Sequence, residues 1–142
     1  MAIPGMTLIT LGAVITKLLD ASALTAVVST RIAPPGPKNK TEPYVAVSKA
    51  RDRTRHGLTY NEPDSAEFGI DIEGWATDYT AAAQLMSLIE AATEGEMVTV
   101  TGWGTCRMEG SGGPVKPYVE NDVWHFHGTR RVKLLLVNQS TS

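Results

Sequence analysis

Cysteine is almost absent from the 142-residue chain, because Cys106 is the only one. A single cysteine excludes a disulfide within the chain and any zinc cluster built from cysteines. No reactive-thiol motif surrounds Cys106, so we expect a buried, inert thiol. The count also fits folding in a reduced, intracellular compartment.

Long apolar runs are missing as well. The most apolar stretch is MAIPGMTLITLGAVITKLLD, which has no basic segment before it and is interrupted by Lys17 and Asp20. It falls short of the roughly 20 apolar residues that cross a bilayer. We therefore expect a core helix in this stretch, a soluble protein and no membrane partner.

Basic residues are missing from one third of the chain. Residues 57–106 carry nine Asp/Glu and no Lys or Arg, a charge of −9, whereas residues 1–56 carry +5 and residues 107–142 carry +2. Two interpretations stay open. Either a strand pair or helix has one acidic face, or the basic segment of one subunit meets the acidic segment of a neighbour.

The fold class follows from length and periodicity. A chain of this size, 42% hydrophobic and 20% charged, fits a single domain over residues 1–142 with a frayed tail at 138–142. Apolar spacing predicts two main helices, over 8–19 and 78–94, the second with Asp78 as N-cap and Gly95 as stop. A short helical turn is expected at 23–28. Alternation predicts four strands, over 44–53, 66–76, 97–105 and 123–137.

This order of elements predicts an α+β fold, with an antiparallel sheet of about four strands and the two main helices packed on one face. The prolines of 33–43 and the glycines and prolines of 107–122 predict surface loops. The segment between the first two strands is too long for a tight turn, so we expect a long projecting β-hairpin there.

A basic stripe, KARDRTRH at 49–56, is the most distinctive local pattern. Its cations fall at every second position and therefore leave one face of a strand: Lys49, Arg51, Arg53 and Arg55. Val45 and Val47 share that odd-numbered face. A continuous strand would have an apolar face that becomes basic halfway along.

Two explanations of this conflict stay open. The strand extends beyond the core, so that its second half projects as a charged arm. Alternatively, a bulge near Ser48–Ala50 exchanges the faces and lays the arginines opposite Glu67, Asp71 and Glu73. Nucleic acid is a weaker explanation, since the stripe is short and the surrounding protein is acidic.

Catalytic and metal-binding motifs are not evident. The pair His125-x-His127 would place both imidazoles on one strand face, but no third ligand is near, which favours two histidines on a solvated face. The glycines of 102–104 and 110–113 lack the strand–loop–helix context of a phosphate loop. We therefore expect no enzyme activity, no catalytic residues, no metal and no cofactor.

Several phrases of the chain resemble the bacteriophage tail-completion family, the small tail terminator proteins of the head–tail junction in long-tailed phages. LLDASALTAVVSTRIAP followed by EPYVAV is similar to the opening of that family. FGIDIEGWATDYTAAAQLMSLI and TRRVKLLLV resemble its later strand, helix and closing strand. The matching positions of the opening phrase are Asp20, Leu24, Thr25, Ala26, Val28, Arg31, Ile32, Pro34, Pro43, Tyr44 and Val45. The stretch 110–117 and WHFH depart from the family pattern, so we expect different partners for the loops that they occupy.

The resemblance implies a structural role in the virion, at the tail or neck, after assembly in the host cytoplasm. Such proteins form a homo-oligomeric ring, typically hexameric, that caps the tail tube and docks onto the head–tail connector or stopper protein. DNA passes through the lumen without its sequence being read. A head-completion adaptor, a tube-like subunit and a small nucleic-acid-binding module are the alternatives.

A ring needs contacts between two different patches of the same chain, and the charge pattern predicts where they lie. We expect an arm over 49–66, an acidic counterpart on the next strand and a second docking surface over 108–122. The expected interface residues are Lys49, Arg51, Arg53, Arg55, His56, Tyr60, Glu67, Asp71, Glu73 and Tyr118.

Overall fold

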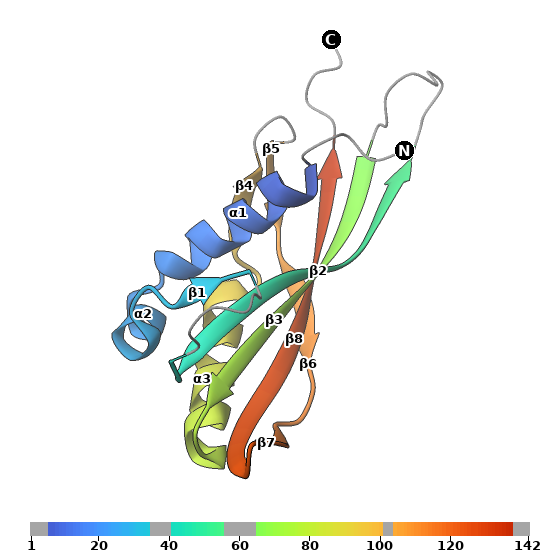
Figure 1. Ribbon diagram of the computed structural model, residues 1–142. Coiled ribbons are helices and arrows are strands. Elements are labelled where there is room, and N and C mark those ends of the chain that lie inside the picture. The colour runs from blue at the N-terminus through green and yellow to red at the C-terminus, as the bar shows by residue number, and fades with distance from the viewer. Residues whose placement is uncertain (1–5, 35–40, 56–64, 101–103, 138–142) are drawn as a thin grey trace.

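Three helices and two β-sheets make up the part of the chain that the structure describes, residues 6–34, 41–55, 65–100 and 104–137 (Figure 1). The structure is a computed structural model. In chain order the elements are α1 (Met6–Leu19), α2 (Ser22–Val28), β1 (Ile32–Ala33), β2 (Tyr44–Arg55), β3 (Ser65–Ala76), α3 (Tyr79–Thr93), β4 (Met97–Val100), β5 (Gly104–Arg107), β6 (Glu109–Gly112), β7 (Lys116–Glu120) and β8 (Val123–Val137).

The main sheet has six strands in the order β1-β2-β3-β8-β6, with β7 also paired to β8. The long strands β2, β3 and β8 are antiparallel, whereas the two-residue β1 runs parallel to β2. The predicted α+β fold is confirmed. The sheet is larger than the expected four strands, and mixed, because β1, β6 and β7 form where composition predicted helix ends or loops.

The predicted strand over 97–105 is wrong as a single element. Instead β4 pairs antiparallel with β5 as a separate two-stranded sheet, with Val98 opposite Cys106. This small sheet packs against α1 through β4. Gly104 adopts a φ of 85°, a conformation that glycine allows at little cost, at the start of β5.

Helix α3 begins and ends as its sequence predicts. Asp78 is the N-cap, and its carboxylate accepts a hydrogen bond from the backbone N–H of Ala81 at 2.7 Å. Gly95, at a φ of 70°, follows the C-cap Glu94 and ends the helix. The helix then packs its buried side chains Leu85 and Ile89 onto the sheet.

The helices cover one face of the main sheet (Figure 1). Side chains of the covered face are fully buried, as the alternation in 66–76 predicts, and on β3 and β8 they are Phe68, Ile70, Ile72, Val132 and Leu134. They share one core cluster with α1 and α3. The opposite face, called here the outer face, carries the intervening residues of the same strands, and no described helix covers it.

A glycine pair lets α3 approach the sheet closely. Gly74 on β3 and Gly128 on β8 are Cα partners, and both are buried. A Cβ at Gly128 would lie 2.6 Å from Cγ of Met86, and one at Gly74 would lie 3.0 Å from Leu85 side-chain atoms. The helix therefore rests on backbone at this point, where a larger residue would push it away.

The expected projecting hairpin is part of a wider ribbon. β2 and β3 pair as far as Arg55 and Ser65, and β8 pairs with β3 to the same end, where Ser65 lies opposite Val137. Figure 1 shows these three strands forming the upper end of the sheet. The described part of the expected arm, residues 49–55 and 65–66, is thus the end of a three-stranded ribbon, and residues 56–64 lie outside the described residues. The expected frayed tail at 138–142 lies outside the described residues.

Candidate functional site: the outer face of the sheet

A β-bulge at Ala50 resolves the conflict between the valines and the arginines of β2. Lys49 pairs with Ile70 and Arg51 with Gly69, so that Ala50 has no partner in β3. Before the bulge, odd-numbered β2 residues are opposite the buried row of β3. After it, Arg51, Arg53 and Arg55 are opposite the alternate row. The predicted bulge is confirmed, and it changes the parity of the strand as a one-residue insertion must.

The acidic residues of β3 lie on the outer face but are not all opposite arginines of β2. Arg53 is the Cα partner of Glu67, whereas Asp71 pairs with Ser48 and Glu73 with Ala46. The expectation that the stripe faces all three acids is therefore wrong for Asp71 and Glu73. They lie on the other side of the bulge from the arginines.

Cations of β8 neutralise two of these acids instead. Arg131 donates two hydrogen bonds to Asp71, at 2.8 and 3.2 Å, and this contact raises the pKa of the guanidinium. Lys133 lies 3.7 Å from the carboxylate of Glu67. Because all four groups are at least partly exposed, these pairs order the surface more than they stabilise the fold.

An aromatic ladder crosses the lower end of the outer face. Tyr44 of β2 stacks on Trp75 of β3, with ring centroids 6.1 Å apart, and Trp75 stacks on His127 of β8 at 4.3 Å. Tyr118 of β7 meets the edge of Trp75 at 5.7 Å. The ladder follows from register, since Trp75 is the Cα partner of both Tyr44 and His127.

A pocket of about 360 Å³ opens beside the ladder, and in this article it is called the aromatic–acidic pocket. It is lined by Glu42, Tyr44, Trp75, Tyr118, Glu120 and His125. These residues come from the segment before β2, from β2 and β3, and from the β7–β8 hairpin, whose turn holds Asn121 and Asp122 at positive φ.

The pocket is electronegative. The side chain of Glu42 is only 8% exposed, and its Oε1 hydrogen-bonds Nδ1 of His125. Oε2 of the same carboxylate is buried and has no hydrogen-bond partner among the described residues. Burial, reinforced by the carboxylates of Glu42, Glu73 and Glu120, raises the pKa of Tyr44 to about 12.

The sequence predicted that the two histidines of β8 lie on a solvated face, but both make contacts within the protein. His125 bonds Glu42, and His127 lies half-buried against Trp75. The strand face of these histidines carries the aromatic ladder, and the alternation of residues in β8 does not by itself predict these ring contacts. Within the described residues no group of three or more His, Cys, Asp or Glu could hold a metal ion.

Of the remaining predicted site residues, one lies in a strand and two lie outside the described residues. Tyr118 lies in β7 and is 44% exposed, so the expected loop over 108–122 is largely the two strands β6 and β7. His56 and Tyr60 lie outside the described residues. Cys106 is half-buried, and burial raises the pKa of its thiol.

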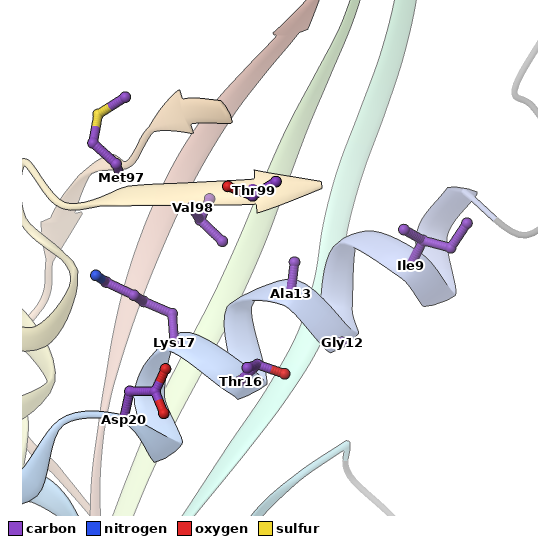
Figure 2. A pocket seen from close by; sticks show the side chains of 9 residues that line it. All are labelled: Ile9, Gly12, Ala13, Thr16, Lys17, Asp20, Met97, Val98 and Thr99. Carbon is purple, nitrogen blue, oxygen red and sulfur yellow. The ribbon is translucent and has the colours of Figure 1, made fainter. Parts of the chain in front are cut away.

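A second cavity, of about 380 Å³, lies between α1 and β4. Figure 2 shows its side chains, from Ile9 to Lys17 on α1, Asp20 just after that helix, and Met97 to Thr99 on β4. Lys17 spans it to reach Glu96 at 3.2 Å. The exposed Ile9 and Met97 make it partly apolar, but it has no converging charged groups comparable to those of the first pocket.

Across the described ranges, no single helix is both long and apolar enough to span a membrane. Ile9–Leu19 and Ser22–Val28 meet the length and composition criterion only as a pair, across a 91° bend. Core helices meet the same criterion, and α1 and α2 bury Val14, Leu18, Leu24 and Val28.

Comparison with known proteins gives a likeness of fold. No protein-family model and no curated protein matches the chain. Among solved structures, it is similar to a chain of the virion of a native gene transfer agent (GTA) particle, with a TM-score of 0.63 and 14% sequence identity. The match covers 88% of this chain and 92% of that chain, so the two share their fold over almost their whole length.

Proposed function

We propose that the protein is a structural component of a long-tailed phage virion, and specifically a tail terminator. In this role it forms a ring, typically hexameric in the tail-completion family that the sequence resembles, that caps the tail tube and joins it to the head connector. DNA passes through the lumen without being read. The observation that carries the proposal is the near full-length likeness of fold to a chain of a GTA virion.

Sequence supports the finer assignment. The phrases at 18–34 and 42–47 resemble the tail-completion family, and the chain keeps them in the order that the family shows. The match to a GTA virion rests on the backbone and the resemblance to a phage family rests on residues, and the two agree on a phage-like virion component. Both favour a subunit that works by assembly and not by catalysis.

The outer face supports assembly in a ring. No described helix lies over it (Figure 1), and the side chains of Tyr118 and Arg131 are exposed on it. The stripe and the acids on the other side of the bulge, Asp71 and Glu73, are different parts of the surface. A contact between them on two copies is heterologous and can close into a ring. We therefore place Arg51, Arg53 and Arg55 at a subunit seam.

Native mass spectrometry of the isolated protein, alone and with the tube protein of the same phage, tests this function. A closed ring of fixed subunit number supports a terminator. Open polymers of variable length would identify a tube-like subunit instead. A salt-dependent shift of DNA without any ring would favour a nucleic-acid-binding module.

Replacing the three arginines tests the seam. The Arg51→Ser/Arg53→Ser/Arg55→Ser variant should lose the ring on a sizing column, and the wild-type ring should weaken as salt screens the exposed charges. A control variant, Lys17→Ser/Lys38→Ser/Lys40→Ser, removes three charges from outside the stripe and should keep the ring. An unchanged ring in the arginine variant would contradict an electrostatic seam.

A further inference from the structure

The aromatic–acidic pocket has the chemistry of a site for a cationic side chain. Trp75 is stacked between Tyr44 and His127, so the rings beside it in the lining, Tyr44 and Tyr118, are the ones a cation would meet. A guanidinium or ammonium group is attracted to an aromatic ring within about 6 Å of its centroid. Arginine fits best, because its planar guanidinium both stacks on aromatic rings and donates to carboxylates in pairs.

An unused acceptor inside the pocket points to a donor from outside the described chain. Glu42 is more than nine-tenths buried, and its Oε2 receives no hydrogen bond among the described residues, although its Oε1 is bonded to His125. A buried carboxylate oxygen without a donor is unfavourable. An incoming N–H group would satisfy it.

The charges around the pocket favour a cation. Glu42 precedes β2, Glu73 lies on β3 and Glu120 ends β7, and all three act on Tyr44. Two basic residues lie nearby: His125, which is hydrogen-bonded to Glu42, and Lys116, whose Cα partner is His127. The lining itself holds two carboxylates, Glu42 and Glu120, and one basic residue, His125, whereas Glu73 and Lys116 both lie outside it.

The chain itself supplies a matching cation donor at the other end of the same strand. The stripe of Arg51, Arg53 and Arg55 begins seven positions beyond Tyr44 along β2, a rise of roughly 23 Å. A rigid strand cannot bring its own stripe to its own pocket. The stripe of one copy can meet the pocket of another, in a head-to-tail contact.

We propose that the aromatic–acidic pocket binds an arginine of the basic stripe of a neighbouring copy of this chain. The guanidinium would stack against the ladder and donate to Glu42. The ring of the proposed function rests on a contact of this type, but the contact can be tested without any virion component.

A peptide of the chain's own residues 47–57 is the direct probe. It is titrated by calorimetry into the full-length Arg51→Ser/Arg53→Ser/Arg55→Ser protein, which keeps its pocket and lacks a competing stripe. We expect saturable one-to-one binding, weakened at least tenfold by Glu42→Gln or Trp75→Leu in that protein. The control Glu90→Gln, an exposed acid on α3, should change affinity less than twofold.

Two results would overturn the proposal. One is no binding of the peptide to a protein whose fold is confirmed by circular dichroism. The other is equal binding to the Glu42→Gln and Glu90→Gln proteins, which places the peptide elsewhere. A peptide with lysine at 51, 53 and 55 should bind several-fold more weakly if stacking and paired donation matter.

Mixing two defective variants tests the head-to-tail geometry. The stripe variant and a Glu42→Gln/Trp75→Leu variant should each stay monomeric, and together they should form a one-to-one pair with no larger species. Absence of the pair, where wild type assembles, contradicts the contact. Peptide binding without ring formation on the tube would instead contradict the tail-terminator function and leave the contact in place.

Discussion

Buried Arg130 gives the sharpest test of how the fold is stabilised. It occupies the core row of β8, is 4% exposed, and donates from Nε to the hydroxyl of Thr93 at 3.0 Å and from Nη2 to Glu94. Thr93 in turn donates to the carbonyl of Ile89 at 2.8 Å. The guanidinium is therefore held between α3 and the sheet, and only Glu94 is a direct anionic partner among the described residues.

Removing the anion should cost more than removing the cation. Glu94→Ala leaves a buried guanidinium without its counter-charge, and hydrogen bonds to charged groups contribute about 1.5–3 kcal/mol. Since the Glu94 side chain is 51% exposed, solvent screening places the loss near the lower end, about 1.5–2 kcal/mol. Arg130→Met leaves no buried charge and fills similar volume, so its loss should be below about 1 kcal/mol.

Urea unfolding, followed by circular dichroism, measures both free energies of unfolding at unchanged m-value. Glu90→Ala, an exposed acid one turn earlier on α3, is the control and should stay within about 0.5 kcal/mol of wild type. The reasoning is refuted if Arg130→Met destabilises as much as Glu94→Ala. In that case the guanidinium would contribute through its packing and its bond to Thr93.

Three further tests follow from other parts of the fold. Burial and nearby carboxylates raise the pKa of Tyr44 from 10.0 to about 12. The free energy of unfolding should therefore fall as pH rises between these values, compared with the Tyr44→Phe variant. An ultraviolet titration in which all tyrosines ionise together would disprove the shift. Gly128→Ala should cost about 1–3 kcal/mol in thermal unfolding because its Cβ meets Met86 at 2.6 Å, and a Met86→Ala background should remove most of that loss; an equal loss in both backgrounds argues against the clash. Since burial raises the pKa of Cys106, iodoacetamide should alkylate it several-fold more slowly in the folded than in the urea-unfolded protein, and equal rates would show a reactive thiol.

The sequence correctly predicts elements whose caps and apolar alternation lie within one continuous segment. Asp78 and Gly95 bound α3 as expected, and Phe68, Ile70 and Ile72 form the buried row of β3. The bulge at Ala50 is one of the two explanations that the sequence leaves open, because valines and arginines of the same parity cannot share one core face.

Glycine-rich and proline-rich segments were predicted poorly because their structure depends on a partner strand. β6 and β7 have few apolar residues and no alternation of apolar and polar residues. They form strands because their backbones pair with β8 within residues 123–133. The strand expected over 97–105 is likewise replaced by two strands, because β4 pairs with β5. Tertiary pairing outweighs propensity in such segments.

The aromatic–acidic pocket could not be predicted for a related reason. Its lining is drawn from residues 42–44, 75 and 118–125, which only the register of β2, β3, β8 and β7 brings together. Tyr118 was expected at an interface, but its neighbours Trp75 and Glu42 carry no local signal. The partner roles of the basic stripe and of Tyr118 stay predictions.

Native mass spectrometry of the wild-type protein with its tube protein tests the central claim, assembly into a closed ring at the end of a tail, most directly. We predict one closed oligomer of fixed subunit number that binds the tube. This oligomer should be absent in the Arg51→Ser/Arg53→Ser/Arg55→Ser variant. A monomer that does not bind the tube, or an open series of polymers, would contradict it.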